Sequence, residues 1–378
     1  MVNDIQNKII IIGGGLIGEL LHLMLKSKGF EINHFAKALK IKNRTFALSP
    51  SSVDWLRSLG FPSSFFEALS EIKSMKIFDS SIKNSVTLDA EDVHKPALAY
   101  MVNEKDFNVA IKKTFNNGKN FKKLSTDFEI KTEQEQVILK FHNEEHKASI
   151  IIACDGANSM VREKIAINPL KHDFKQTALS FELKVKSEIQ KQAFQFFLKE
   201  SILAVLPIRK GLVSIVWSCD YQFFEKLNNL DDKSIENELN LIIGNYYKDI
   251  KIASKKEYFP LFMNSVESIF KDRVLLVGDA AHFIHPMAGQ GLNLGIRDII
   301  FLEKNIDKKD YMDIGLKGFL RKYERVRKED VSQMGFLTFG LNWIFSKKST
   351  IVIGMIEKGM SMLDKSKFLK QQLIKKAI

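Results

Sequence analysis

The sequence of 378 residues predicts an α/β protein in which a nucleotide-binding parallel sheet is interrupted by a second, mixed sheet and followed by helices. Two segments predict the parallel sheet, because each joins a short apolar run to a glycine-rich loop and then to apolar residues with helical spacing. They begin at Lys8–Ile12 and at Arg273–Val277. Short runs with hairpin-like spacing between them predict the mixed sheet. A chain of this length is expected to form two intergrown domains.

The first segment predicts a βα unit that binds a dinucleotide. Residues 13–18 read Gly-Gly-Gly-Leu-Ile-Gly, which is the G-x-G-x-x-G pattern after a strand and before a helix. In this pattern Gly13 permits the tight turn, Gly15 lets the backbone approach a pyrophosphate, and Gly18 lets the helix pack closely on the strand. The helix is expected to end before Gly29. A plain glycine turn is the alternative, and the flanking strand and helix argue against it.

One expected residue is missing from this unit. The second strand is expected near Glu31–Phe35, and an Asp or Glu at its end normally binds ribose hydroxyls. The register places Ala36 there, followed by Lys37. The loss is expected to remove one or two charge-assisted hydrogen bonds, each worth roughly 1.5–3 kcal/mol. The cofactor could therefore bind loosely or be absent, which leaves a non-catalytic role open.

The second segment, residues 278–298, is the most informative stretch of the chain. Asp279 stands at the end of the expected strand, and Gly289 and Gly291 open a helical pattern that includes Leu292. The N-terminus of a helix attracts negative charge, and a carboxylate accepts hydrogen bonds from hydroxyl groups. Together these parts suit a phosphorylated cofactor that carries hydroxyl groups.

Two further segments lie between these units. Residues 43–48 read Asn-Arg-Thr-Phe-Ala-Leu, where the planar fork of Arg44 suits a phosphate better than a lysine would. A solvated loop arginine is the alternative. Residues 150–162 form an expected strand, the turn Asp155-Gly156 and a helix start that carries Arg162. We expect Asp155 to brace loops, and Arg162 either to hold this helix or to screen a phosphate.

These four segments resemble those of class A flavoprotein monooxygenases. The run Ala-Gly-Gln-Gly-Leu-Asn-Leu-Gly at 288–295 looks most like the ubiquinone-biosynthesis hydroxylase branch. The resemblance implies tightly held FAD, NAD(P)H as a transient reductant and O2 as co-substrate. In that family a flavin C4a-hydroperoxide transfers oxygen to an aromatic ring. It implies an FAD-dependent monooxygenase that hydroxylates a polyprenylated phenol in ubiquinone biosynthesis. A class A hydroxylase of a small soluble aromatic and a flavin-poor scaffold subunit of a biosynthetic complex are the alternatives.

The resemblance also implies site residues. Lys105 stands where the family usually has an arginine, and a surface lysine is an equal alternative. No catalytic residue is assigned: His282 and His285 are each expected to be structural, although one of them could relay a proton or polarise a phenol, and Pro286 is expected to shape the loop. His285 and Pro286 are the candidates. The eight histidines show no metal-ligand spacing, so no metal is expected. The cofactor contacts implied are Gly13, Gly15, Leu16, Ile17, Gly18, Arg44, Lys105, Asp155, Asp279, Gly289, Gln290, Gly291, Leu292 and Asn293.

The expected fold is thus α/β, with a Rossmann-like FAD-binding domain, an interleaved mixed-sheet substrate domain and C-terminal helices. The FAD-binding domain comprises 1–70, 100–165 and 263–335, the substrate domain 71–99 and 166–262, and the C-terminal helical segment 336–378. The aromatic side chains of the substrate domain fill the core of its sheet more readily than a pocket, although a substrate chamber is the alternative. They are Phe194, Phe196, Phe197, Trp217 and Phe259.

Composition limits the partners. The net charge is +12, but 48 lysines and nine arginines are spread along the chain, which argues against nucleic acid and leaves attraction to a membrane surface as the alternative. Cys154 and Cys219 are expected to be buried thiols, as in a reducing cytoplasm. The run Ile9–Ile12 is too short for a signal peptide, and no apolar stretch is long enough to span a bilayer. The apolar segment Phe336–Leu363 is expected to pack on the body, with a biosynthetic partner or a peripheral membrane contact as alternatives.

Overall fold

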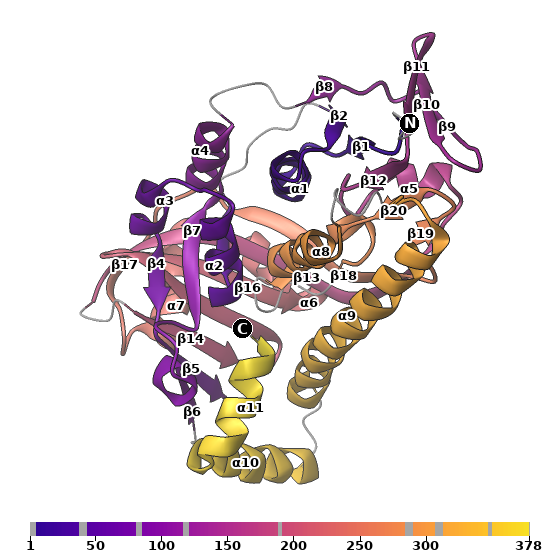
Figure 1. Ribbon diagram of the computed structural model, residues 1–378. Coiled ribbons are helices and arrows are strands. Elements are labelled where there is room, and N and C mark those ends of the chain that lie inside the picture. The colour runs from indigo at the N-terminus through magenta and orange to yellow at the C-terminus, as the bar shows by residue number, and fades with distance from the viewer. Residues whose placement is uncertain are drawn as a thin grey trace.

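The computed structural model describes residues 5–37, 44–80, 85–115, 121–187, 191–283, 290–306, 313–346 and 350–377. Figure 1 shows a parallel sheet and helix α1 in the upper part of the molecule and a larger mixed sheet below them. Helix α9 runs down the right side, and α10 and α11 lie at the bottom. The α/β fold class predicted from the sequence is confirmed.

The parallel sheet is built from the predicted glycine-loop units. Its strand order is β19-β20-β12-β1-β2-β8, and β19 alone among these described strands runs antiparallel. Helices α1 (Leu16–Ser27) and α8 (Gln290–Asn305) follow the two glycine-rich loops. The strand bounds are β1 Lys8–Ile12, β2 Glu31–Ala36, β8 Lys122–Lys123, β12 Ile150–Ala153, β19 Phe270–Lys271 and β20 Val274–Leu276.

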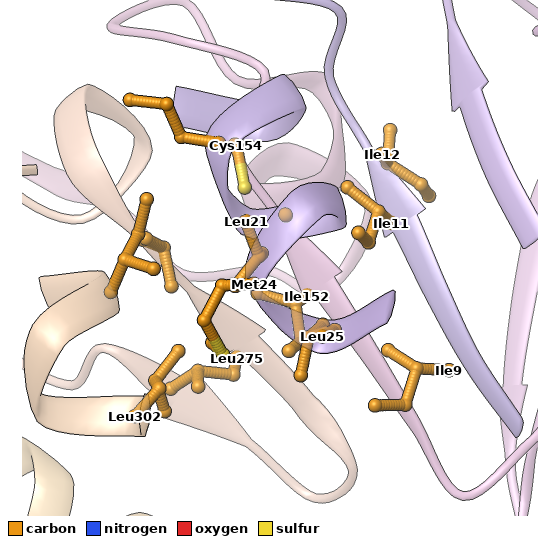
Figure 2. Packing of buried hydrophobic residues seen from close by; sticks show 14 of the residues in the cluster. Ile9, Ile11, Ile12, Leu21, Met24, Leu25, Ile152, Cys154, Leu275 and Leu302 are labelled. Carbon is orange, nitrogen blue, oxygen red and sulfur yellow. The ribbon is translucent and has the colours of Figure 1, made fainter. Parts of the chain in front are cut away.

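The core of this domain lies between the sheet and its helices. A parallel sheet is covered on both faces, so its strands are apolar along their whole length, as Ile9–Ile12 is. Figure 2 shows side chains of α1, among them Leu21 and Met24, packed against Leu275 and Leu302. Burial of each such side chain contributes roughly 1.5–3 kcal/mol. This packing fixes the ends of β1 and β20 relative to α1 and α8.

The mixed sheet has the order β17-β13-β16-β15-β14-β5-β6, and β18 also pairs with β13. Its pairings are antiparallel except for β14 with β5. Helices α6 (Tyr221–Asn228) and α7 (Asp232–Ile243) pack on one face. The strand bounds are β5 Ser74–Asp79, β6 Ser85–Asp89, β13 Pro169–Lys186, β14 Gln192–Phe197, β15 Ser201–Arg209, β16 Leu212–Asp220, β17 Lys248–Ile252 and β18 Glu257–Val266.

Most of the aromatic residues considered for a chamber belong to the core. Phe194, Phe196 and Trp217 are buried in the cluster formed with α6 and α7, and the Trp217 indole N–H donates to Ser201 Oγ at 3.0 Å. The chamber alternative is therefore wrong for these three residues. Phe259 is half-buried on another strand, and Phe197 is buried outside that cluster.

Shorter elements connect the two sheets. Strands β3 (Thr45–Leu48), β7 (Ala99–Asn103) and β4 (Ser70–Ile72) form a small sheet in the order β3-β7-β4, beside helix α4 (Glu104–Thr114). A second small sheet and further helices complete the fold: β9 Glu129–Thr132, β10 Val137–Phe141, β11 Glu144–Ala148, α2 Pro50–Ser58, α3 Ser63–Glu67 and α5 Met160–Lys164.

The C-terminal helices are α9 (Lys317–Ser346), α10 (Thr350–Lys365) and α11 (Lys367–Ala377). Met360 and Ile374 are buried against Val86 and Leu88 of β6, so α10 and α11 cover the edge of the mixed sheet (Figure 1). The side chains of the predicted apolar segment 336–363 are described only from residue 357 onward. This last part packs on the body of the protein, as expected. Among the described residues no helix is long and apolar enough to cross a membrane.

Candidate active site

Close packing requires glycine at positions 13 and 18 of the first loop, whereas position 15 faces open space. Gly13 has φ +135°, and a Cβ there would lie 2.3 Å from the Cys154 carbonyl oxygen. A Cβ on Gly18 would lie 1.9 Å from the Gly13 carbonyl oxygen. A Cβ on Gly15 would meet no described heavy atom within 4 Å, although Gly15 is the N-cap of α1. The backbone at Gly15 is therefore open to an anion at a helix N-terminus, as a pyrophosphate requires.

A buried histidine is hydrogen-bonded to the backbone of this loop. His34 Nε2 lies 2.8 Å from the Gly13 carbonyl oxygen, and His34 Nδ1 lies 3.1 Å from His22 Nδ1. Burial lowers the pKa of His34 to about 4, and the bond to Gly13 opposes this shift only in part. Because His34 is neutral, its Nε2–H donates to Gly13, and its Nδ1 accepts from His22. Sequence reasoning missed His34, whose only local signal is a polar residue inside an apolar strand.

The end of β2, the corner where the sequence predicts the ribose of the cofactor, carries the alanine that the register predicts. β2 ends at Ala36, which is buried, and a Cβ on Gly14 would lie 2.7 Å from the Ala36 Cβ. Ala36 pairs with Lys123 of β8. The predicted register of β2 is therefore confirmed, and a methyl group occupies the position where an acid would face the ribose.

Arg44 forms an ion pair that was not predicted. Its Nε and Nη2 donate to the two carboxylate oxygens of Glu104 at 2.9 Å each, and the Glu104 backbone N–H donates to the Arg44 carbonyl at 2.8 Å. The Glu104 hydrogen bond is the main cause that raises the pKa of Arg44. About half of the Arg44 side chain stays exposed, so the outer edge of its fork remains available. Lys105, the neighbouring candidate, is exposed. At the start of α4 it is the Glu104 side chain that contacts Arg44.

Asp279 follows β20, as the second segment predicts, and lies in a 3-10 turn at Gly278–Ala280. Its Oδ1 is 3.7 Å from the point that a Cβ on Gly291 would occupy, so the carboxylate faces the beginning of α8. Burial raises the pKa of Asp279, while the charges of His282 and Arg44 oppose that shift. Gly289, His285 and Pro286 lie outside the described residues, and the side chain of Gln290 is not described.

A buried network holds the backbone beside Asp279. Asp298 is fully buried, and its Oδ2 accepts from the Gly278 backbone N–H at 2.7 Å and contacts His282 Nε2 at 2.8 Å. Its Oδ1 accepts from Arg327 Nε at 2.5 Å. Burial alone would raise the pKa of Asp298, but His282 and Arg327 hold it below its ordinary value. His282 is thus structural, as expected, whereas Asp298 and Arg327 were missed because 29 residues separate them.

The Asp-Gly turn is braced to the same region. Asp155 Oδ2 accepts from the Val161 backbone N–H at 3.1 Å, while its buried Oδ1 has no partner among the described residues. Burial raises the pKa of Asp155. Arg162 donates to the carbonyls of Ala157 at 2.8 Å and Ala280 at 2.9 Å, so it ties this loop to the loop of Asp279. Of the two roles considered for Arg162, the structure therefore supports the structural one.

The side chain of Asn293, which the resemblance implies as a cofactor contact, binds other parts of the protein. Its Oδ1 accepts from the Ser49 N–H and the Ser52 hydroxyl, both at 2.9 Å, and its Nδ2 donates to the Ala47 carbonyl at 2.8 Å. The side chain therefore fixes α8 to β3 and α2, which leaves the backbone of the helix start to meet a cofactor. Ile17 likewise packs at this junction, because a Cβ on Gly295 would lie 2.6 Å from its Cδ1.

The residues present fit a flavin dinucleotide. The open backbone at Gly15 suits the pyrophosphate, Asp279 beside the N-terminus of α8 suits hydroxyl groups, and the unpartnered Asp155 oxygen offers a further acceptor. Within the described ranges no group of His, Cys, Asp and Glu could hold a metal ion. Fold and site together define an FAD-binding α/β oxidoreductase.

Sequence comparison places the chain in a family. The family model described as "FAD binding domain" matches residues 6–334, so the chain belongs to this family of class A flavoprotein monooxygenases. The chain is 26% identical to the mitochondrial ubiquinone biosynthesis monooxygenase COQ6 of Dictyostelium discoideum, over 97% of this chain and 90% of that protein. It is 24% identical to the 3-demethoxyubiquinol 3-hydroxylase of Escherichia coli, over 98% of both chains. The chain is an FAD-dependent monooxygenase.

Solved structures confirm the fold. The p-nitrophenol 4-monooxygenase PnpA of Pseudomonas putida superposes with a TM-score of 0.76 and 16% identity, over 98% of this chain and 97% of that one. HpxO of Klebsiella pneumoniae, in complex with FAD and uric acid, gives a TM-score of 0.71 and 16% identity over 98% and 96% of the two chains. At these identities the likeness concerns the fold alone.

Proposed function

We propose that this chain hydroxylates the aromatic ring of a polyprenylated phenol in ubiquinone biosynthesis. The observation that carries the proposal is the match, over nearly the whole chain, to relatives named for ubiquinone biosynthesis. The described part of the site supports it, because the open backbone at Gly15, Asp279 and the N-terminus of α8 suit a flavin dinucleotide. FAD, when bound and reduced, supplies the activation of O2 for transfer of one oxygen atom to the ring.

The residues of this chain bind and orient the reactants. Gly15 and the first turn of α1 would hold the pyrophosphate, and Asp279 would accept hydrogen bonds from cofactor hydroxyls. The N-terminus of α8 would direct its partial positive charge at the cofactor and stabilise negative charge there. Arg162 binds the Ala280 carbonyl and Asp298 binds the Gly278 N–H, so the backbone on both sides of Asp279 is held in place. Asp279 therefore needs no rearrangement during the reaction.

Two alternatives remain from the sequence. Hydroxylation of a small soluble aromatic is the first, because the shared fold does not set the size of the substrate. A flavin-poor scaffold is favoured by Ala36, which leaves the ribose corner without its acid. A flavin absorption spectrum of the purified protein tests the scaffold alternative, since a scaffold would be colourless even with added FAD.

The test of the proposed reaction is product analysis with FAD, NAD(P)H and O2. A prenylated phenol and its unprenylated analogue are supplied in separate reactions, and the hydroxylated products are identified by mass spectrometry. We expect a higher kcat/KM for the prenylated phenol, with oxygen from O2 in the product. A higher kcat/KM for the unprenylated analogue would favour the soluble-substrate alternative instead.

The last two helices present a surface suited to a membrane. Met362 and Phe368 are each 66% exposed, and the exposed Lys358, Lys365 and Lys367 lie around them. Apolar side chains flanked by lysines are typical of helices that lie on anionic lipid. Insoluble substrates require such a contact or a partner that presents them, so we infer that the corner between α10 and α11 contacts the membrane peripherally.

Liposome flotation tests this inference. The double variant Met362→Ser and Phe368→Ser should lose the salt-resistant part of binding to anionic vesicles. The lysine contribution should fade with added salt in both proteins, because exposed charges are screened over about 8 Å at physiological ionic strength. Leu241→Ser on α7 is the control, since Leu241 is 82% exposed on another helix. Equal flotation of all three proteins would contradict the assignment of this corner.

A further inference from the structure

The mixed sheet has a second face that differs from the one under α6 and α7. Leu206 of β15 packs with Ala47 of β3 and Met101 of β7, so this face is directed toward the strands that hold α8. Strand pairing places Ser180, Val216 and Ala204 in one row on it. We call it the small-residue face; its members are Ala178, Ser180, Ala204, Ser214, Val216 and Ser218. Short side chains leave room for a ligand in front of a sheet.

Glu257 belongs to this face. Its neighbour Lys256 forms an ion pair with Asp232 of α7 at 2.7 Å, and the Tyr258 ring lies 5.5 Å from the Phe224 ring of α6. Successive side chains of a strand point to opposite faces, so Glu257, between these two, points away from the helices. Its cross-strand neighbour is Ser180, a member of the small-residue face.

The carboxylate of Glu257 is half-buried and has no hydrogen-bond or ion-pair partner among the described residues. The face to which Glu257 belongs is directed toward β3 and β7, because Leu206 packs against both strands. In agreement, after the dominant hydrogen bond to Glu104, the charge of Glu257 is the last of the causes that raise the pKa of Arg44, the residue before β3. A partly buried acid without a partner costs desolvation energy unless a ligand supplies a donor. A hydroxyl group of the ligand would satisfy it.

We propose that Glu257 accepts the hydrogen bond of the phenolic hydroxyl of the substrate and thereby sets which edge of the ring faces the cofactor. The inference rests on the proposed function for the identity of the substrate as a phenol. A hydrogen bond to a carboxylate is charge-assisted, and it increases electron density on the ring oxygen. The same carboxylate opposes ionisation of the phenol, because two negative charges repel each other at short range.

The ionisation state of a bound probe tests the assignment. 4-Nitrophenol is mixed with the FAD-loaded protein at a pH where the free probe is largely phenolate, and its phenolate absorption band is followed. Wild-type protein should bind the neutral phenol, so the band should decrease. Glu257→Gln should bind the probe with the band retained. Glu225→Gln, an exposed acid of α6 on the opposite face, should behave as wild type. Failure of wild type to bind the probe, or binding as phenolate, overturns the assignment.

Kinetics separate this inference from the proposed function. With a prenylated phenol, Glu257→Gln should raise KM about tenfold, the effect of one hydrogen bond to a charged group. It should also shift the product toward other ring positions, which loss of a merely structural contact would not do. Unchanged KM and products in this variant, with wild-type turnover intact, overturn only the role of Glu257. A wild type that protonates 4-nitrophenol but hydroxylates no phenol overturns only the proposed reaction.

Discussion

After β20 the backbone beside Asp279 is held by buried charged groups, whereas at the end of β2 the corresponding corner carries only the methyl group of Ala36. Asp298 binds Gly278, His282 and Arg327 at the first corner. At the second, Gly14 and Ala36 meet without a polar side chain between them. The comparison indicates that the loop of Asp279 is organised before the cofactor arrives, while the ribose end supplies less binding energy. Four predictions test this contrast.

The largest effect is expected at the glycine loop itself. Gly15→Val should yield folded but colourless protein, because the side chain would occupy the open space that the pyrophosphate needs. Titration with FAD, followed by fluorescence quenching, measures the loss, and circular dichroism checks the fold. Gly318→Val is the control, since a side chain there also meets open space, but on α9. Full yellow colour in Gly15→Val would show that the pyrophosphate binds elsewhere.

The organised corner should be costly to disrupt. Asp298→Asn leaves the buried Arg327 with only the partly exposed Asp330 as a charge partner, which should lower the free energy of unfolding by about 3–5 kcal/mol. Asp330→Asn removes the other partner of Arg327, but Asp330 is 28% exposed and should cost at most about 1 kcal/mol. Urea denaturation measures both. Equal losses in the two variants would mean that the Asp298 network contributes no special stability.

The histidine below the glycine loop predicts a pH dependence. His34 has a folded-state pKa of about 4 and an ordinary value of 6.5, so between these values the unfolded chain binds a proton that the folded chain rejects. The contribution of His34 to stability should therefore fall as the pH falls from about 6.5 to about 4, by an amount on the order of 3 kcal/mol. Burial raises the pKa of Glu19 to about 7, which gives the opposite slope in the same window, so the effect of His34 is measured as the difference between wild type and variant. His34→Gln keeps a donor for Gly13 and should remove this loss. His94→Asn, at an exposed position, is the control and should retain the loss. A pH profile of stability in His34→Gln that matches that of the wild type would refute the assignment.

The smallest effect is expected at the ribose corner. Ala36→Glu should tighten FAD binding about tenfold, or about 1.4 kcal/mol, by supplying one hydrogen bond to a ribose hydroxyl. Affinity for riboflavin, which lacks the adenosine, should not change. Isothermal titration measures both ligands. No gain for FAD would mean that another group already binds the ribose.

Local patterns predicted the parts of the site that follow from local geometry. The glycines at 13, 15 and 18, the position of Asp279 and the register that ends at Ala36 all follow from a strand, a turn and a helix adjacent in sequence. The missed contacts join distant segments: Arg44 and Glu104 are 60 residues apart, and Asn293 lies 244 residues from Ser49. Nothing in the spacing of such residues shows that folding brings them together. Phe194 and Trp217 were ambiguous for the same reason, since only the position of α6 and α7 decides between core and chamber.

The placement of Arg327 on α9 has a practical consequence for shortened forms of the protein. A chain that ends before Arg327 would leave Asp298 without its guanidinium partner and so weaken the support of the Gly278 backbone beside Asp279. A chain that ends just after Asp330 would keep that support but uncover Val86 and Leu88, which Met360 and Ile374 now shield. Such a fragment should bind flavin and yet self-associate, because an uncovered apolar strand at a sheet edge is a site of aggregation.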